Sequence, residues 1–466
     1  MYREILDRYI DEHKEEMLED VKTLVRVDSV RGEAKEGMPF GEGPAKVIEV
    51  AEKMLSGYGF KTTNYDNYVI TADFNDEEKQ LDILAHLDVV PVSPSDWTVT
   101  APFEPVILDG KIYGRGTADD KGPAVAALYA MRAIRESGIQ LPKNVRLILG
   151  ADEECGSGDL EYYYKKEAEA PMTFTPDANF PVINIEKGRL AKEFGAEFSE
   201  EPVLPAVTAF HCGTAVNIVP ANAFAVVKGL SMETVNAAIA SDESGAAFTA
   251  SACEDAIKIV AKGVPFHASM PDGGNNALCS LLELLGTLPL SDCPQNRTLK
   301  AISGLFPRTD YYGEALGVNI EDEVSGKLTM NLGILNYEGS TLCGQFDSRV
   351  PVCGNNENVT RVIENKFAEN GLSYDSVLLT PPHYVPADSE LVQALMACYE
   401  NYTGIKGEPI AIGGGTYVHE LERGVAFGCE MDGVDNHMHG NDEFMEIDVL
   451  VMSAKIFADA IIRLCK

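Results

Sequence analysis

The feature that most constrains the fold of this chain is a short apolar run that ends in three acids. Residues 144–151 read NVRLILGA, and Asp152, Glu153 and Glu154 follow directly. An apolar run of this length predicts a strand in the interior of an α/β sheet. Ligands of such sheets collect beyond the carboxyl ends of the strands. The three acids therefore indicate a polar site at that edge rather than a solvated surface.

A second apolar run brings a histidine and an acid toward the same edge. In LDILAHLDVVP, His86 and Asp88 end a predicted strand two positions apart, so both side chains leave one face. A single histidine at a strand end is more often a hydrogen-bonded structural residue than a ligand. Beside an acid at this spacing, His86 fits a metal ligand whose second ring nitrogen is held by a carboxylate. The segment MTFTPDANFPV places Asp177 at another strand end.

A pair of aspartates lies in the stretch Gly114–Pro123, which reads GRGTADDKGP. Asp119 and Asp120 stand between a glycine-rich turn and a predicted alanine-rich helix over 122–137. For a lone Asp-Asp pair, a polar turn that caps a helix is the ordinary explanation. The positive end of the helix dipole favours anions at this place. The pair becomes a ligand candidate only together with the residues above.

Charge and composition exclude several classes of function. The chain has 466 residues and a formal net charge of -35 at pH 7, which argues against nucleic acid or an anionic membrane as a partner. No apolar run approaches the length of a bilayer span. The amino-terminal segment predicts a charged amphipathic helix rather than a signal peptide, so we expect a cytoplasmic protein. The 10 cysteines form no Cys-x-x-Cys pair, and most are expected to be buried thiols.

The length favours two domains. From Glu186 to about residue 380 the chain changes character, with strand-like alternation and Gly and Asn turns. We predict an α/β fold in which residues 1–185 and 381–466 form one domain, and residues 186–380 form a second domain inserted into it.

The candidate ligands form a mixed imidazole and carboxylate set without thiolate. They are His86, Asp119, Glu154, Asp177 and one of His437 or His439. Such a set suits catalytic zinc or manganese rather than a closed structural site. It exceeds what one four-coordinate ion needs, so two ions that share a bridging aspartate are the economical interpretation. Hydrolysis also needs a free general base, and Glu153 is the candidate.

Five motifs, in this order, resemble one metallopeptidase family: HLDVVP, GRGTADDKGP, the Glu153-Glu154 pair, the Asp177 segment and HGNDE. The family includes carboxypeptidase G, aminoacylases, succinyl-diaminopimelate desuccinylase and carnosinase. Within it, VPVSPSDW, the long lid, FDSRVP and GGGTY are most similar to bacterial dipeptidases of the PepV type, over essentially the full chain. The resemblance implies a zinc-peptidase-like catalytic domain, with a central mixed sheet flanked by helices, and an inserted α+β lid domain.

The resemblance also implies a role for each candidate. Two zinc ions, replaceable by manganese or cobalt, would share Asp119. The other ligands would be His86 and Asp177 for one ion, and Glu154 and His439 for the other. HGNDE matches the family pattern at His439, whereas His437 does not match it. Glu153 would be the general base, Asp88 would orient His86, and the Asp119-Asp120 peptide would be cis.

Three residues outside the metal set are implied in substrate binding or catalysis. His267 would reach the site within one chain and stabilise the oxyanion. Asn217 and Arg349, with backbone near Gly415, would bind the terminal carboxylate of a small peptide substrate. The long lid implies a monomer. Where the family usually has arginine after GGGTY, this chain has His419, which leaves the substrate preference open.

The leading hypothesis is a metal-dependent dipeptidase that hydrolyses free dipeptides, with the Xaa-His type as one candidate class. A metal-bridged water would attack the peptide bond, and Glu153 would serve as general base. One alternative is a deacylase or desuccinylase of N-acylated amino acids. Another is a non-catalytic homologue that binds peptides. The length of the lid favours the dipeptidase, and the presence of Glu153 and every ligand disfavours the non-catalytic homologue.

Overall fold

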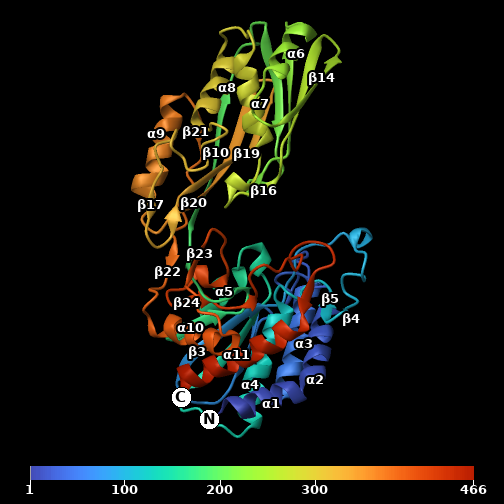
Figure 1. Ribbon diagram of the computed structural model, residues 1–466, viewed down its shortest axis with the longest axis vertical. Coiled ribbons are helices and arrows are strands. Elements are labelled where there is room, and N and C mark those ends of the chain that lie inside the picture. Colours follow the sequence, from blue (N-terminus) through green and yellow to red (C-terminus); the bar gives the residue numbers. More distant parts are fainter. Residues whose placement is uncertain (1) are drawn as a thin grey trace. The chain divides into compact units, whose positions relative to one another are not determined.

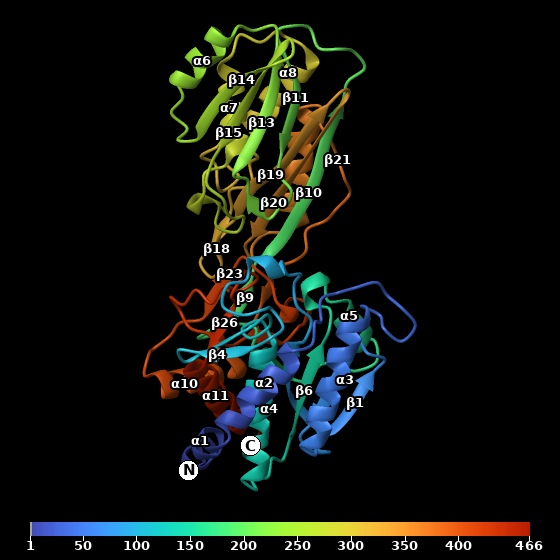
Figure 2. The same ribbon diagram turned by 90° about the vertical axis from the view of Figure 1, so that its right-hand side faces the viewer.

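The computed structural model describes residues 2–466, which divide into two compact units. Unit 1 contains the chain up to Ile185, His383–Ile410 and Gly415–Lys466. Unit 2 contains Glu186–Pro382 and Ala411–Gly414. Each unit has its own sheet and its own hydrophobic core (Figures 1 and 2). Among the described residues, no helix combines the length and the apolar character that crossing a membrane requires.

Unit 1 is built on a mixed sheet, as predicted. Its strands in spatial order are β1 (Lys61–Tyr65), β2 (Val69–Asp73), β6 (Asn144–Gly150), β3 (Lys79–His86), β7 (Met172–Thr175), β24 (Gly424–Ala426), β9 (Ile183–Glu186) and β22 (His383–Tyr384), with β23 (Ile410–Ile412) paired to β9. Strands β6, β3, β7 and β24 run parallel to their neighbours in that series. The pairs β1 with β2, β2 with β6, and β9 with β24 are antiparallel.

Helices cover both faces of this sheet. They are α1 (Arg3–Glu12), α2 (Lys14–Val25), α3 (Glu42–Gly57), α4 (Lys121–Glu136), α5 (Gly158–Tyr164), α10 (Glu390–Thr403) and α11 (Ile447–Cys465). Alternate residues of β3 belong to different cores: Ile83 and Ala85 join the large core with α4 and α11, which lie side by side (Figure 1). Leu84 joins a smaller core with Leu160 and Tyr163 of α5. Two buried faces explain why these strands are almost wholly apolar.

Short strands join two distant motifs of unit 1. One small sheet contains β4 (Val106–Leu108), β5 (Lys111–Tyr113) and β26 (Phe444–Glu446), and another pairs β8 (Ala178–Asn179) with β25 (Cys429–Glu430). Tyr113, the last residue of β5, pairs with Phe444, the first residue of β26. Gly114 begins the loop after β5, and Glu443 ends the segment before β26. These two residues therefore flank the same strand pair.

Unit 2 is an antiparallel sheet with helices, which confirms the predicted α+β class. The strands in order are β14 (Ala247–Cys253), β15 (Ala256–Lys262), β13 (Asn222–Lys228), β11 (Ala206–Cys212), β19 (Thr329–Glu338), β20 (Thr341–Val350), β10 (Gly188–Glu197) and β21 (Ser373–Tyr374). The helices are α6 (Met232–Ala240), α7 (Ala277–Thr287), α8 (Pro294–Leu305) and α9 (Arg361–Glu369). Ala223, Ala225 and Val227 alternate with less buried residues along β13, so one face of the sheet packs on the helices (Figure 2).

Predicted elements occur close to their expected bounds. The helix predicted over 122–137 is α4, and the strand predicted over 144–151 is β6. The single amino-terminal helix is instead two helices, because His13 leaves helical geometry. The ring of His13 stacks on Tyr9, with centroids 3.9 Å apart, and its Nδ1 lies 2.8 Å from the Tyr9 carbonyl oxygen.

Candidate active site

The ends of three neighbouring parallel strands bring four predicted site residues together. His86 is the last residue of β3. Glu153 and Glu154 begin a short 3-10 helix just after β6, and Asp177 follows β7 by two residues. Parallel strands place their carboxyl ends at one edge of a sheet, which is where ligand sites of open α/β sheets form.

Asp119 lies between the two predicted histidine ligands. Its Oδ1 is 2.9 Å from Nε2 of His86, and its Oδ2 is 2.8 Å from Nε2 of His439. The same nitrogen of His86 lies 3.6 Å from Asp177 Oδ2, and that of His439 lies 3.3 Å from Glu154 Oε1. One carboxylate thus faces an imidazole and carboxylate pair on each side. This is the arrangement expected of a ligand that bridges two cations.

Two overlapping groups of donor atoms are close enough to share a cation. They are His86 with Glu153 and Asp177, and His86 with Asp119 and Glu154, and within each group the atoms lie no more than 4.8 Å apart. Imidazole nitrogen and carboxylate oxygen are ordinary zinc ligands. The residues present therefore fit a divalent metal. The peptide bond between Asp119 and Asp120 is cis, as the resemblance implied.

Asp88 connects the histidine to the two glutamates. The backbone carbonyl of Asp88 lies 3.1 Å from Nδ1 of His86, whereas its carboxylate is 3.5 Å from that nitrogen. Both oxygens of this carboxylate accept backbone N–H groups, from Glu153 and Glu154, at 3.1 Å each. With its proton on Nδ1, His86 has its Nε2 lone pair free for a cation bound beside Asp119. Asp88 therefore contacts His86 mainly through its main chain, while its side chain binds the backbone of Glu153 and Glu154.

Burial and crowding perturb the acids and histidines of this site. Burial raises the pKa of Glu153 well above its ordinary value, and it also raises the pKa values of Glu154 and Asp177. Hydrogen bonds to Asp119 and Glu154 raise the pKa of His439 to about 11. Several carboxylates and few neutralising groups share a buried space, an arrangement typical of cation sites and of catalytic sites.

In unit 2, His267 lies on a short strand, and Asn217 directly precedes the strand paired to it. His267 ends β16 (Phe266–His267) and pairs with Ile218 of β12 (Ile218–Val219), while the backbone N–H of Ala268 donates to the Asn217 carbonyl at 2.9 Å. The backbone N–H of Ser269 donates to Nδ1 of His267 at 3.2 Å. Burial, reinforced by a nearby arginine, lowers the pKa of His267. The Ser269 hydroxyl lies 2.6 Å from Nδ1 of His267, so Ser269 contacts this nitrogen through both its backbone and its side chain.

Arg349 is held at the end of β20 within unit 2. Its Nε and Nη2 donate to Asp347 at 2.7 and 3.1 Å, and Nη1 donates to the carbonyl of Gly413 at 2.5 Å. A guanidinium has five N–H groups, so these contacts leave two for an anion such as a carboxylate. A Cβ added to Gly413 would lie 2.7 Å from Cβ of Ser269, which shows how closely these loops approach. Gly415 belongs to unit 1.

Two buried acids of unit 1 were not predicted. Asp159 accepts the backbone N–H groups of Ala151 and Asp152, at 2.6 and 2.9 Å, and the hydroxyl of Tyr417. Glu443 accepts N–H groups of the loop that carries Asp119. Glu443 ends the HGNDE motif, and Tyr417, the partner of Asp159, ends GGGTY, although no local pattern distinguishes a buried acceptor from a surface acid.

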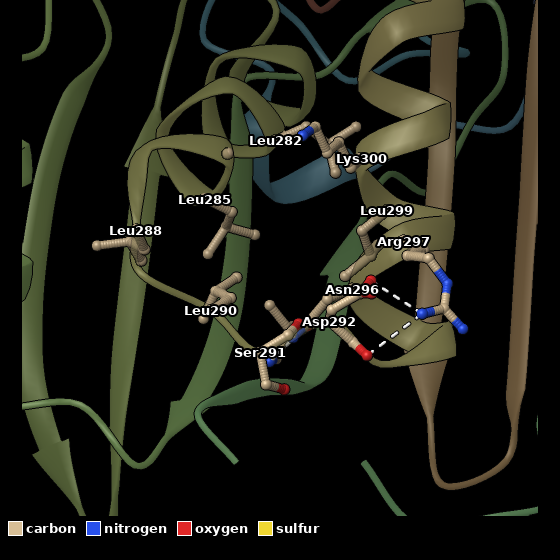
Figure 3. A pocket seen from close by; sticks show the side chains of 12 residues that line it. Leu282, Leu285, Leu288, Leu290, Ser291, Asp292, Asn296, Arg297, Leu299 and Lys300 are labelled. Atoms are coloured by element: carbon tan, nitrogen blue, oxygen red, sulfur yellow. Dashed lines mark hydrogen bonds and ion pairs between the residues drawn. The ribbon is translucent and has the colours of Figure 1, made fainter. Parts of the chain in front are cut away.

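A hollow of about 330 Å³ lies between α7 and α8 in unit 2 (Figure 3). Leucines, among them Leu285 and Leu299, form much of its lining, and Arg297 at its edge donates to Asp292 at 2.8 Å. None of the predicted site residues is part of its lining, so this hollow contributes nothing to the candidate active site.

The motifs and their geometry agree with comparisons to known proteins. Residues 83–463 match the sequence profile of peptidase family M20/M25/M40. The chain belongs to this family. It is 35% identical over 469 residues to the putative dipeptidase YtjP of Bacillus subtilis (strain 168), covering 97% of this chain and 98% of that protein. It is 32% identical over 462 residues to the Beta-Ala-Xaa dipeptidase of Lactobacillus delbrueckii subsp. lactis, with 97% of each chain covered.

Solved structures show the same M20 architecture. Human carnosine dipeptidase 1 matches with a TM-score of 0.61 at 18% identity, covering 100% of this chain and 99% of that one. The dipeptidase Dug1p of Saccharomyces cerevisiae matches with a TM-score of 0.59 at 15% identity, with coverage of 100% and 99%. The M20 chain described here is a metal-dependent dipeptidase and a peptide hydrolase, as predicted.

Proposed function

We propose that this M20 enzyme hydrolyses free dipeptides with two zinc ions, for which manganese or cobalt can substitute. The observation that carries the proposal is the Asp119 carboxylate, which presents one oxygen to His86 and the other to His439. His86 and Asp177 would hold one ion, and Glu154 and His439 the other. When bound, such a metal pair lowers the pKa of a water molecule and polarises the scissile carbonyl.

Glu153 acts as the general base in this proposal. It lies within 4.8 Å of donor atoms of His86 and Asp177, and its backbone N–H is fixed by Asp88. Burial raises the pKa of this carboxyl in the metal-free site, and the positive charge of bound metal ions would favour the ionised form that accepts a proton. It takes the proton of the attacking water and transfers it to the leaving amine.

His267 and Arg349 act on the substrate from unit 2. The Nε2–H of neutral His267 donates to the carbonyl oxygen as negative charge develops there. The two N–H groups of Arg349 not engaged by Asp347 or Gly413, with Asn217 and backbone near Gly415, bind the terminal carboxylate of the dipeptide. One chain supplies all of these residues, so we propose an active monomer.

The names of similar proteins support dipeptides as the substrate class. The Lactobacillus relative is a Beta-Ala-Xaa dipeptidase, and the human protein of similar fold is a carnosine dipeptidase. We therefore include dipeptides ending in histidine among the candidate substrates. His419, which stands where the family usually has arginine, is a candidate determinant of that preference.

A matched panel of substrates tests the proposal. Protein reconstituted with zinc, and with a measured metal content, is incubated with free dipeptides including Xaa-His, with the same peptides N-acetylated or N-succinylated, and with tripeptides. We expect about two metal ions per chain and cleavage confined to the free dipeptides. Cleavage of the blocked compounds alone would assign the protein to the deacylases instead. If fully metallated protein cleaves none of these compounds, both the dipeptidase and the deacylase hypotheses are wrong.

A further inference from the structure

Glu443 is a buried acceptor at the junction of two motifs. It is the last residue of HGNDE, four positions after His439, and its side chain is fully buried. Its Oε1 accepts three backbone N–H groups of the loop before α4: Gly116 at 3.0 Å, Ala118 at 2.9 Å and Asp119 at 3.3 Å. The main chain of Asp119, the proposed bridging ligand, is thus bound directly by this carboxylate.

The second oxygen of Glu443 connects this loop, through Arg115, to the backbone beside His439, another proposed ligand. Oε2 accepts from Nη1 of Arg115 at 2.5 Å, and Nη2 of the same arginine donates to the carbonyl of Gly440 at 2.8 Å. Gly440 directly follows His439. Arg115 is only 2% exposed, so this charge pair is shielded from solvent. The pair links the backbone at Asp119 to the backbone at His439.

The loop conformation explains why one oxygen can receive three donors. Gly116 has φ of 89°, a backbone region that favours glycine, and a Cβ there would lie 2.9 Å from Cδ of Lys121. Successive N–H groups in such a turn point toward one centre and form an anion-binding concavity. The N–H of Thr117 turns back instead to the carbonyl of Gly114, at 3.2 Å. Glu443 supplies the anion for this concavity.

We propose that Glu443 is a positioning residue of the metal centre. By holding the Asp119 loop and, through Arg115, the backbone beside His439, it fixes the spacing of these two ligands and so raises metal affinity. The inference rests on the metal ligands assigned under the proposed function. Removing a residue that hydrogen-bonds a metal ligand without touching the metal typically lowers metal affinity ~10- to 100-fold.

The neighbouring acid supplies a matched control. Asp442 also anchors the HGNDE segment, but to a different loop: it accepts the backbone N–H groups of Thr98 and Val99, at 2.8 and 2.9 Å, and the Thr98 hydroxyl at 2.6 Å. If zinc affinity depends only on how firmly the HGNDE segment is anchored, Asp442→Asn should lower it as much as Glu443→Gln does. If zinc affinity depends on the position of the Asp119 loop, only Glu443→Gln should lower it.

The experiment measures metal binding rather than turnover. Metal-free wild-type protein, Glu443→Gln and Asp442→Asn are titrated with Zn²⁺ against a chromophoric chelator, and the visible absorption of each Co²⁺ form is recorded. We expect zinc affinity to fall ~10- to 100-fold and the cobalt spectrum to change in Glu443→Gln. We expect Asp442→Asn to stay within about twofold of wild type, in line with a contact that touches no proposed ligand. Unchanged zinc affinity and cobalt spectrum in Glu443→Gln, or equal losses in both variants, would overturn the inference.

A second variant covers the case in which Glu443→Gln does not fold. Glu443→Asp keeps a negative charge opposite Arg115 but is one methylene shorter, so it cannot reach both the arginine and the loop. We expect it to fold and to bind zinc more weakly than wild type, and wild-type affinity in this variant would also overturn the inference. Failure of dipeptide hydrolysis, with the Glu443 dependence of metal binding intact, would instead contradict only the proposed function.

Discussion

The backbone N–H of Ser269 donates to Nδ1 of His267, with nitrogen atoms 3.2 Å apart. The Ser269 hydroxyl lies 2.6 Å from the same nitrogen, and when Nδ1 accepts from these two groups the proton of the neutral ring sits on Nε2. Burial lowers the pKa of His267, which keeps the ring neutral at physiological pH. These contacts support the proposed role of His267 as a hydrogen-bond donor rather than as a base.

Replacing His267 tests its role as that donor. We expect His267→Ala to lower kcat by about 10²- to 10³-fold, the usual effect of removing one oxyanion donor. Zinc content should remain that of wild type, because the proposed metal ligands all lie in unit 1. Steady-state kinetics at matched zinc content provide the measurement. Wild-type kcat in the variant would exclude His267 from catalysis.

Glu153 should be required for turnover but not for the fold. In Glu153→Ala we expect metal to be retained and kcat to fall at least ~10²- to 10⁴-fold, the range attributed to a positioned base. The control is Glu161→Gln, an exposed glutamate on α5 that pairs with Lys165 at 2.7 Å. Activity and metal content are measured in parallel. Full activity in Glu153→Ala would require another base.

Arg349 should matter more for free dipeptides than for amidated ones. Arg349→Ala removes the N–H groups proposed to bind the terminal carboxylate, so we expect KM for free dipeptides to rise ~10- to 100-fold, as for a lost hydrogen bond to a charged group. C-terminally amidated peptides should be affected much less. Arg297→Ala, which changes an exposed arginine of α8, serves as control. Equal losses for both kinds of peptide would argue against the carboxylate contact.

Asp159 should make stability depend on pH. Burial raises its folded-state pKa to about 7, above the ordinary value of about 3.9. The protonated form is thus favoured by folding, and its stabilisation is fully present below pH ~4 and lost as the pH rises through ~7. We expect metal-free wild type to lose more stability than Asp159→Asn between pH 5 and pH 8, by roughly 1 to 3 kcal/mol.

Urea unfolding of both proteins at the two pH values checks this expectation. The difference between the variants is the informative quantity, since other groups that titrate in this range are common to both. A difference that is the same at pH 5 and at pH 8 would show that Asp159 does not titrate with the fold.

Much of the site could be predicted because its residues follow strong local patterns. The apolar run over 144–151 predicts a buried strand, and parallel neighbours then bring Glu154 and His86 to one edge. Glu443 could not be found in this way, because its partner loop begins more than three hundred residues earlier in the chain. Nor could the main-chain contact of Asp88 with His86, since residue type alone does not show which oxygen lies nearest.

The sequence by itself determined the fold class, the family and the candidate ligands, because apolar periodicity and short ordered motifs are local properties that survive without coordinates. Only the tertiary structure decided how these residues act on one another. It placed the two oxygens of Asp119 against His86 and His439, and it placed Ser269 against Nδ1 of His267. These features depend on burial and on contacts between segments far apart in the chain, which no local pattern encodes.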